Sequence, residues 1–258
     1  MGLNLEGRSC IVTGASAGIG LAIAVELARE GARVVLAARR PGPLEEAAEL
    51  VRSAGTGDAI AVAADTSDHE SVGHLVATTV ERFGTVDVLV NNAAVGGGRA
   101  RPAEATAVNL SAVAEDFAEK VLGYLRCAQA VAPHMITQRF GRIINIAGTA
   151  ARTTGVVSSS IRQASVSALS KNLADELGPF GITTTTLHPG PTRTARVDER
   201  IRADDALRQK FEAESSLGRI VEPEEVGWVV AFLASPKSVA INGETITCGG
   251  GMRGFIDY

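Results

Sequence analysis

Short apolar runs alternate along the chain with longer stretches in which apolar residues recur at helical spacing. The short runs are rich in Val, Ile and Ala, and strands that are apolar on both faces are typical of a parallel sheet covered by helices on each side. The runs are Ser9–Thr13, Arg33–Ala37, Ala59–Ala63, Val86–Asn91, Arg142–Ile146, Thr183–Leu187 and Glu244–Cys248. The pattern therefore predicts an α/β fold, with a single doubly wound parallel sheet of about seven strands and helices on both faces.

One domain is expected over residues 1–258, because no Pro-, Gly- or Ser-rich linker, repeat or low-complexity segment divides the chain. The one long irregular stretch runs from Pro189 to about Asp198 and leads into a charged helical segment, Glu199 to Ser215. Such segments beside a binding site often close over it, so we expect a lid-like substrate segment at about 190–217. Trp228 falls in a helical stretch and is expected in the core.

The composition is that of a soluble globular protein, with 45% hydrophobic and 21% charged residues among 258. A formal net charge of −4 argues against nucleic-acid and anionic-membrane partners, which require a basic face. No apolar run is long enough to span a membrane and the start has no signal-peptide pattern, so we predict a cytoplasmic protein. The three cysteines are widely spaced in apolar stretches, which predicts reduced thiols. No spacing of His, Cys or carboxylate residues predicts a metal site.

The first predicted strand runs into a glycine-rich turn, residues 13–20, and a predicted helix continues to about Glu30. Gly14 allows a sharp exit from the strand, Gly18 lets a pyrophosphate approach the backbone, and Gly20 permits close helix packing. The unpaired N–H groups at the helix start favour phosphate oxygens. We predict a Rossmann-like dinucleotide site formed by Gly14, Ser16, Gly18, Ile19 and Gly20. The alternative is a glycine-rich turn that binds no ligand.

Further motifs follow this turn in order along the chain. They are Asp65 at the end of the third predicted strand, Asn91-Asn92-Ala93-Ala94 after the fourth, Ala168-Leu169-Ser170-Lys171 through Glu176-Leu177-Gly178, and Pro189-Gly190-Pro191-Thr192-Arg193-Thr194. Together with the Gly-x-x-x-Gly-x-Gly spacing, they resemble the short-chain dehydrogenase/reductase family. The resemblance implies cofactor contacts from Asp65, Thr66, Asn92, Ala93, Pro189, Gly190, Thr192 and Thr194. It also implies a homo-oligomer, a dimer or tetramer, formed through the two long helices beside the active site and the last strand.

The choice of nicotinamide cofactor depends on the residues about twenty positions past the glycine turn. An acid there would accept a hydrogen bond from the adenosine ribose 2′-hydroxyl, whereas an Arg accommodates a 2′-phosphate through charge-assisted hydrogen bonds. The chain has Ala37-Ala38-Arg39-Arg40 and no acid. NADP(H) is therefore favoured over NAD(H), with Arg39 as the phosphate ligand; the alternative is that the two arginines form a solvated loop.

The chain departs from the family at the residues that carry its proton chemistry. The family uses a Tyr-x-x-x-Lys motif on a helix, a Ser at the preceding strand end and an Asn on a neighbouring helix. No Tyr-x-x-x-Lys occurs here, since the tyrosines are Tyr124 and Tyr258. Counting back from Lys171 along the helix places Ser159 and Gln163 at the Tyr and Lys positions, whereas counting forward from the strand places Ile161 and Ser165 there. Gly148 takes the Ser position and Lys120 the Asn position. We adopt the helix count, because a loop can shorten freely and a helix register cannot.

Two residues are candidates for the missing acid. Lys120 could act if burial lowers its pKa towards the working pH, and the alternative is a solvated i, i+4 brace with Asp116. Ser159 could donate a hydroxyl hydrogen bond to a substrate, and the alternative is a helix N-cap within Ser158-Ser159-Ser160.

A positioned general acid typically contributes about 10² to 10⁴ to the rate, whereas holding two reactants together is worth effective molarities of about 10⁵ to 10⁸ M. Hydride transfer can therefore survive without the phenol if the substrate needs little proton donation. The sequence favours an atypical oxidoreductase that transfers a hydride between NADP(H) and a small iminium, activated alkene or ketone. The alternative is a catalytically silent NADP(H)-binding subunit or redox sensor.

Overall fold

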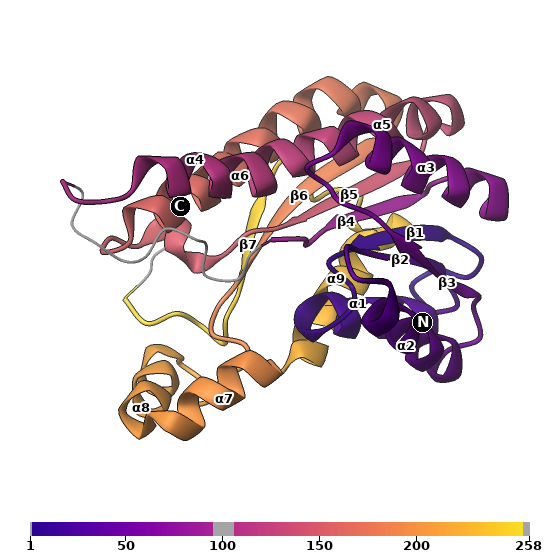
Figure 1. The fold of residues 1–258 in the computed structure, drawn as a ribbon. Helices are drawn as coiled ribbons and strands as arrows, with labels where there is room; N and C mark the ends of the chain where they lie inside the picture. Colours follow the sequence, from indigo (N-terminus) through magenta and orange to yellow (C-terminus); the bar gives the residue numbers. More distant parts are fainter. Residues whose placement is uncertain (1, 95–105, 255–258) are drawn as a thin grey trace.

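The computed structural model describes residues 2–94 and 106–254. Its strands form one parallel sheet of seven strands in the order β3-β2-β1-β4-β5-β6-β7. Their bounds are β1 Ser9–Thr13, β2 Arg33–Ala38, β3 Ala59–Ala63, β4 Val88–Asn91, β5 Gly141–Ile146, β6 Ile182–Pro189 and β7 Thr245–Cys248. The predicted fold class is confirmed, because the strands pair in parallel and helices cover both faces of the sheet (Figure 1).

Helices pack on the two faces in separate layers (Figure 1). On one face lie α1 Gly18–Arg29, α2 Pro41–Ala54 and α9 Pro223–Ala234, and on the other α3 His69–Phe83, α5 Gly123–Gln138 and α6 Val157–Leu177. Neighbouring residues of β1 serve opposite layers, since Val12 packs with the α1 side and Ile11 with the α3 side. A strand buried on both faces must be apolar throughout, which explains the continuous apolar runs in the sequence.

The strand order reverses between β1 and β4, which are neighbours in the middle of the sheet. In a parallel α/β sheet, ligands bind in the crevice at the carboxyl ends of the strands on either side of such a reversal. Here the strands end at Thr13 and Asn91, so the fold brings the glycine turn together with the Asn-Asn-Ala-Ala segment.

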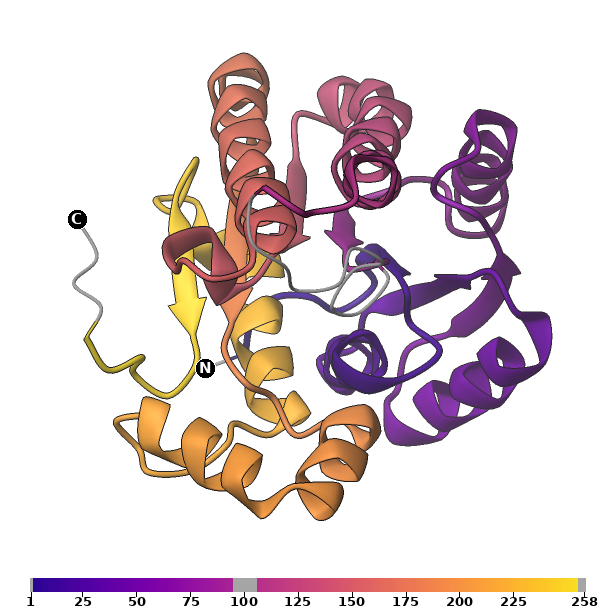
Figure 2. The same ribbon diagram turned by 60° about the vertical axis from the view of Figure 1, so that its left-hand side comes forward.

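The segment after β6 differs from the sequence prediction. The helix begins earlier, as α7 Ala195–Ala203, because the Thr194 hydroxyl accepts a hydrogen bond from the Val197 amide and caps it. A second helix, α8 Asp205–Glu214, is separated from it by Asp204, whose carboxylate caps the new helix. Both helices lie beyond the carboxyl ends of the strands (Figures 1 and 2).

Trp228 was expected in the core, and this prediction is wrong, because its side chain is 56% exposed. Helix α9 turns Val226 and Val230 inward, and Gly227 lies against the Ala22 carbonyl of α1. The helix is apolar on more sides than it buries, so its pattern could not indicate which face meets the sheet.

Candidate functional site

The glycine turn is rigidly joined to the end of β4. The Thr13 hydroxyl accepts hydrogen bonds from the amides of Asn92 at 2.9 Å and Ala93 at 3.0 Å. The Asn92 side chain donates to the carbonyls of Thr13 and Gly14, at 3.0 and 3.2 Å. A Cβ at position 20 would lie 2.3 Å from the Gly14 oxygen, so only glycine fits there.

Helix α1 begins at Gly18, and its start is equipped for an anion. Its N-cap, Ala17, makes no side-chain capping hydrogen bond, and the first turn holds no acid. Gly14 and Gly18 have positive φ values of 66° and 59°, a conformation that favours glycine, and neither has a side chain that would cover the backbone of the turn. The unpaired amides and the positive end of the helix dipole therefore face outward, as phosphate binding requires.

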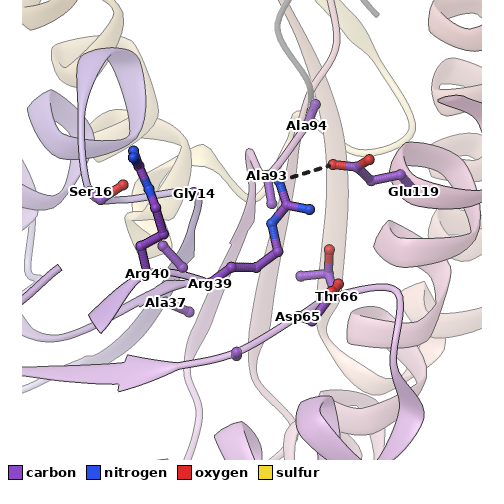
Figure 3. Close-up of a pocket in the computed structure, with 12 residues that line it drawn as sticks. Gly14, Ser16, Ala37, Arg39, Arg40, Asp65, Thr66, Ala93, Ala94 and Glu119 are labelled. Atoms are coloured by element: carbon purple, nitrogen blue, oxygen red, sulfur yellow. Dashed lines mark ion pairs between the residues drawn. The ribbon is translucent and has the colours of Figure 1, made fainter. Parts of the chain in front are cut away.

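A cavity of about 430 Å³ lies on the β2 and β3 side of this turn. Figure 3 shows Arg40 extending towards Ser16, while Arg39 points across the cavity to Glu119. The Arg39 Nη2 and Glu119 Oε1 atoms are 4.0 Å apart. Asp65 also lines the cavity, and hydrogen bonds from the Ser67 hydroxyl and amide hold its pKa below the usual range.

A larger cavity of about 1170 Å³ lies on the other side of the turn, between the strand ends and helices α7 and α8. The two cavities share Gly14, Arg40 and Ala94 as lining residues. An elongated ligand with phosphates at its centre fits this arrangement, because its two ends can occupy the two cavities. A dinucleotide has this shape, so the residues present fit a nicotinamide cofactor.

The structure gathers the predicted cofactor residues around these two cavities. Gly14, Ser16, Arg39, Asp65, Thr66 and Ala93 line the smaller cavity, and Gly18, Ile19, Gly20, Asn92, Pro189, Gly190, Thr192 and Thr194 line the larger one. The sequence reasoning missed Glu119, which reaches the smaller cavity from across the sheet and leaves no local signal in the sequence.

Lys120 lines the larger cavity and is 5% exposed. It lies in η1 Ala118–Leu122, a π-helical segment that joins α4 Leu110–Phe117 to α5, and such segments are frequent at functional sites. Its Nζ donates to the Ala147 carbonyl at 3.4 Å and lies 5.6 Å from the ring centre of Tyr124. Burial, followed by the charge of Arg162, lowers the Lys120 pKa to about 7.

The alternative interpretation of Lys120, a solvated brace with Asp116, does not hold, because both side chains are buried. Asp116 lies instead beside the buried Arg162, with 3.9 Å between Oδ1 and Nη1. The Lys120 ammonium thus lies largely buried in the wall of the cavity, where desolvation destabilises its charge.

Tyr124 is the tyrosine nearest to Lys120 along the chain, but it lines neither cavity. It is fully buried, and its hydroxyl donates to the Ile146 carbonyl at 2.9 Å. Burial raises its pKa, so the phenol holds its proton at neutral pH. Tyr258 lies outside the described residues. Within the described chain, no phenol lines either cavity.

Polar side chains behind Lys120 fix the helices to the sheet. Asn91 donates to the Tyr124 carbonyl at 3.2 Å and to the Asn145 side chain at 2.9 Å, and Asn145 donates to Ser170 of α6 at 2.8 Å. All these side chains are buried. They set the register of α5 and α6 against β4 and β5, and therefore the position of Lys120 relative to the strand ends.

Gln163, near the start of α6, lies close to Gly148, which follows β5. A Cβ at Gly148 would be 3.3 Å from the Gln163 Nε2 atom, and the Gln163 Oε1 atom is buried without a hydrogen-bond partner. Ile161, by contrast, is 49% exposed. The strand count would place the exposed Ile161 at the family's Tyr position, whereas the helix count places the buried Gln163 at its Lys position. The burial of Gln163 and the exposure of Ile161 therefore favour the helix count.

Ser159 is not among the residues that line either cavity. The N-cap alternative is wrong, since α6 begins at Val157 with Val156 as its cap, and Ser159 lies within the first turn.

Two kinds of site are not found in residues 2–94 and 106–254. No cluster of three or more His, Cys, Asp or Glu side chains could hold a metal ion there. None of the helices in that part of the chain has both the length and the apolar character of a membrane span.

Known proteins with related sequences and folds cover nearly the whole chain. The family model described as enoyl-(acyl carrier protein) reductase matches residues 14–253. The short-chain reductase protein NovJ of Streptomyces niveus is 36% identical over 251 residues, 93% of this chain and 92% of that protein. The 3-oxoacyl-(acyl-carrier-protein) reductase FabG of Vibrio cholerae is 32% identical, covering 97% and 99%. L-sorbose reductase from Gluconobacter frateurii, solved with NADPH and L-sorbose, superposes with a TM-score of 0.90 at 27% identity, covering 99% and 100%.

These matches identify the class of protein that the fold and the glycine turn define. The chain belongs to the short-chain dehydrogenase/reductase family, whose fold binds a nicotinamide cofactor. The predicted family resemblance is therefore confirmed, and the relatives are oxidoreductases of this type.

Proposed function

We propose that the protein is an atypical member of its family, which transfers a hydride between NADP(H) and a small organic substrate. The substrate class is one that needs little proton donation: an iminium, an activated alkene or an activated ketone. The observation that carries this proposal is the buried Lys120, whose ammonium lines the larger cavity where no described phenol does. Its pKa of about 7 leaves it able to give up a proton at neutral pH.

The preference for NADP(H) rests on the charges of the smaller cavity. Arg39 and Arg40 follow β2 directly, at the position that faces the adenosine ribose in this fold. The Arg39 and Glu119 side chains are 4.0 Å apart, which is too long for a hydrogen bond. A 2′-phosphate can therefore bind the Arg39 guanidinium through shorter, charge-assisted hydrogen bonds. Similar solved structures contain either cofactor, since L-sorbose reductase was solved with NADPH and 7α-hydroxysteroid dehydrogenase with NADH, so the preference rests on the charges of this cavity.

The reaction divides between the cofactor and the chain's own side chains. A bound nicotinamide supplies the hydride and its electron pair. For a ketone, Lys120 gives the Nζ proton to the carbonyl oxygen, and the lysine is left as a neutral amine that regains its proton from solvent. For an iminium, hydride addition to the carbon would give a neutral amine directly, so Lys120 need not donate a proton. Helices α7 and α8 border the larger cavity and can exclude water from it.

A second function, an NADP(H)-binding subunit or redox sensor without turnover, is favoured by three residues in α6 and in the segment before it. Gly148, Ser159 and Gln163 take the places of the Ser, Tyr and Lys on which the family depends, and none of the three is an effective acid. The size of the larger cavity favours the enzyme, because about 1170 Å³, against about 430 Å³ for the smaller cavity, leaves room for a substrate beside one end of the cofactor.

We also propose that the protein is cytoplasmic and assembles into a dimer or tetramer through the long helices beside the site and through β7. Exposed apolar side chains beside the site support the assembly: Leu122 in η1 and Ile161 in α6.

The first test is a fluorescence titration with NADPH, followed by NADPH consumption against matched panels of ketones, cyclic iminium ions and enones. We expect NADPH to bind, and the iminium and enone panels to be reduced faster than unactivated ketones. Binding with no consumption in any panel would transfer support to the silent subunit. Absence of binding would contradict both functions.

A further inference from the structure

Helix α7 presents two arginines to the larger cavity. On α7, Arg196 and Arg200 line the larger cavity, whereas Asp198 does not and instead lies 3.7 Å from Arg193. The two arginines are one helical turn apart and therefore share a face. Like charges at this spacing oppose helix formation slightly, so the arrangement is not explained by the stability of the helix.

The cavity contains an excess of positive charge that its described lining residues do not neutralise. Arg40, Lys120, Arg196, Arg200, Lys210 and Arg253 line it, against Glu214 as the one acid among its described lining residues. Lys210 lies 3.9 Å from Glu214 and is balanced by it. Arg196, Arg200 and Arg253 form no ion pair with any described residue. This excess occurs in a protein whose overall charge is −4.

The cations come from separate parts of the chain, so the cofactor phosphates at the glycine turn do not account for all of them. Thr194 meets the glycine turn, since a Cβ at Gly18 would lie 3.2 Å from its methyl group. Arg196 is two residues further along the chain, in the first turn of α7, and is the nearest of the three in sequence to Thr194. Arg200 is a full turn further along α7, and Arg253 is held at the end of α8, where its amide donates to the Glu214 carbonyl at 2.9 Å.

We propose that Arg200 and Arg253 bind an anionic oxygen group of the substrate, a carboxylate or a phosphate, and that the substrate is an organic anion. The inference rests on the proposed function, in that the cofactor occupies the glycine-turn side of the cavity. Phe211, Val197 and Met252 line the same cavity and can supply apolar contact for the carbon skeleton. Guanidinium groups bind such oxygens through paired hydrogen bonds, which also orient the substrate.

The test uses two unreactive probes of the same shape, 3-phenylpropanoate and 3-phenylpropanamide, titrated calorimetrically into the full-length protein saturated with NADP⁺. Hydrogen bonds to charged groups predict that the carboxylate binds about tenfold or more tightly than the amide. Arg200→Gln and Arg253→Gln should each reduce that preference. Arg202→Gln is the matched control, because Arg202 belongs to the same helix but does not line the cavity.

A separate NADPH titration of each variant distinguishes substrate binding from cofactor binding. We expect an unchanged Kd for NADPH in Arg200→Gln and Arg253→Gln. Equal affinity for the two probes, binding of neither, or a loss of NADPH affinity in place of the carboxylate preference would overturn the inference. Failure of the native protein to bind NADPH would instead count against the proposed function.

Discussion

Replacing Lys120 by Met is expected to reduce ketone reduction by about 10² to 10⁴, the usual contribution of a positioned general acid. Iminium reduction by the same variant should be nearly unchanged, because that reaction takes no proton. The comparison is made within one protein, so an effect of misfolding or of lost cofactor would lower both rates. The measurement is NADPH consumption with both substrates at pH 7.

Two further variants separate the proton from the charge. Lys120→Arg keeps a cation at the same place, but a guanidinium does not release its proton at neutral pH, so ketone reduction should stay low. Lys171→Met removes an exposed lysine that pairs with Asp175 on α6, and it should leave both rates intact. Full activity in Lys120→Arg would show that positive charge alone is sufficient.

Lys120→Met should also stabilise the fold. Burial lowers the Lys120 pKa from 10.5 to about 7, so between these pH values the unfolded chain binds a proton that the native chain has released. Stability therefore rises with pH through this window, and the full penalty of the buried charge is present below pH 7. Its upper limit is about 5 kcal/mol at 1.36 kcal/mol per pKa unit. Thermal unfolding at pH 6 should show a higher Tm for Lys120→Met than for the native chain, with the difference disappearing above pH 10.5.

Replacing Arg39 by Asp is expected to change cofactor preference by about 10² to 10³ in the ratio of the Kd values for NADPH and NADH. The variant loses a charge-assisted pair with the 2′-phosphate, worth about 1.5 to 3 kcal/mol, and gains a carboxylate that repels it. The same carboxylate can accept a hydrogen bond from the ribose 2′-hydroxyl of NADH. Fluorescence titration with each cofactor measures the ratio.

The matched control for this change is Arg29→Asp, in the last turn of α1, where the native side chain is exposed and pairs with Glu26 at 3.5 Å. It introduces the same change in charge outside both cavities, so cofactor preference should not change. If Arg39→Asp and Arg29→Asp behave alike, the two arginines after β2 form a solvated loop and NADP(H) loses its main support.

Much of the fold could be predicted, because parallel strands impose a strong constraint on sequence. Strands such as β1 and β4 are buried on both faces, and continuous apolar runs marked them to within a few residues. The glycine turn was equally readable, since Gly14 and Gly20 stand where any Cβ would meet backbone. Local chemistry dictated these residues, and local sequence therefore revealed them.

The missed features depend on contacts between distant parts of the chain. Glu119 reaches the smaller cavity from a helix on the far side of β4, and the sequence near Arg39 carries no trace of it. The burial of Lys120 depends on the packing of α5 and α6 and on a π-helical segment, neither of which a spacing pattern specifies. The N-cap alternative for Ser159 was wrong because α6 begins earlier, at Val157.

The most direct test of the central claim is the pH dependence of a single turnover, in which NADPH-loaded native protein is mixed rapidly with a ketone. Lys120 must be protonated to act, and its pKa is about 7. The rate of NADPH oxidation should therefore be constant at low pH and fall about tenfold per pH unit above 7. With an iminium substrate the profile should be flat. A ketone rate that is independent of pH from 6 to 9, or that rises above pH 7, would contradict the role of Lys120 as proton donor.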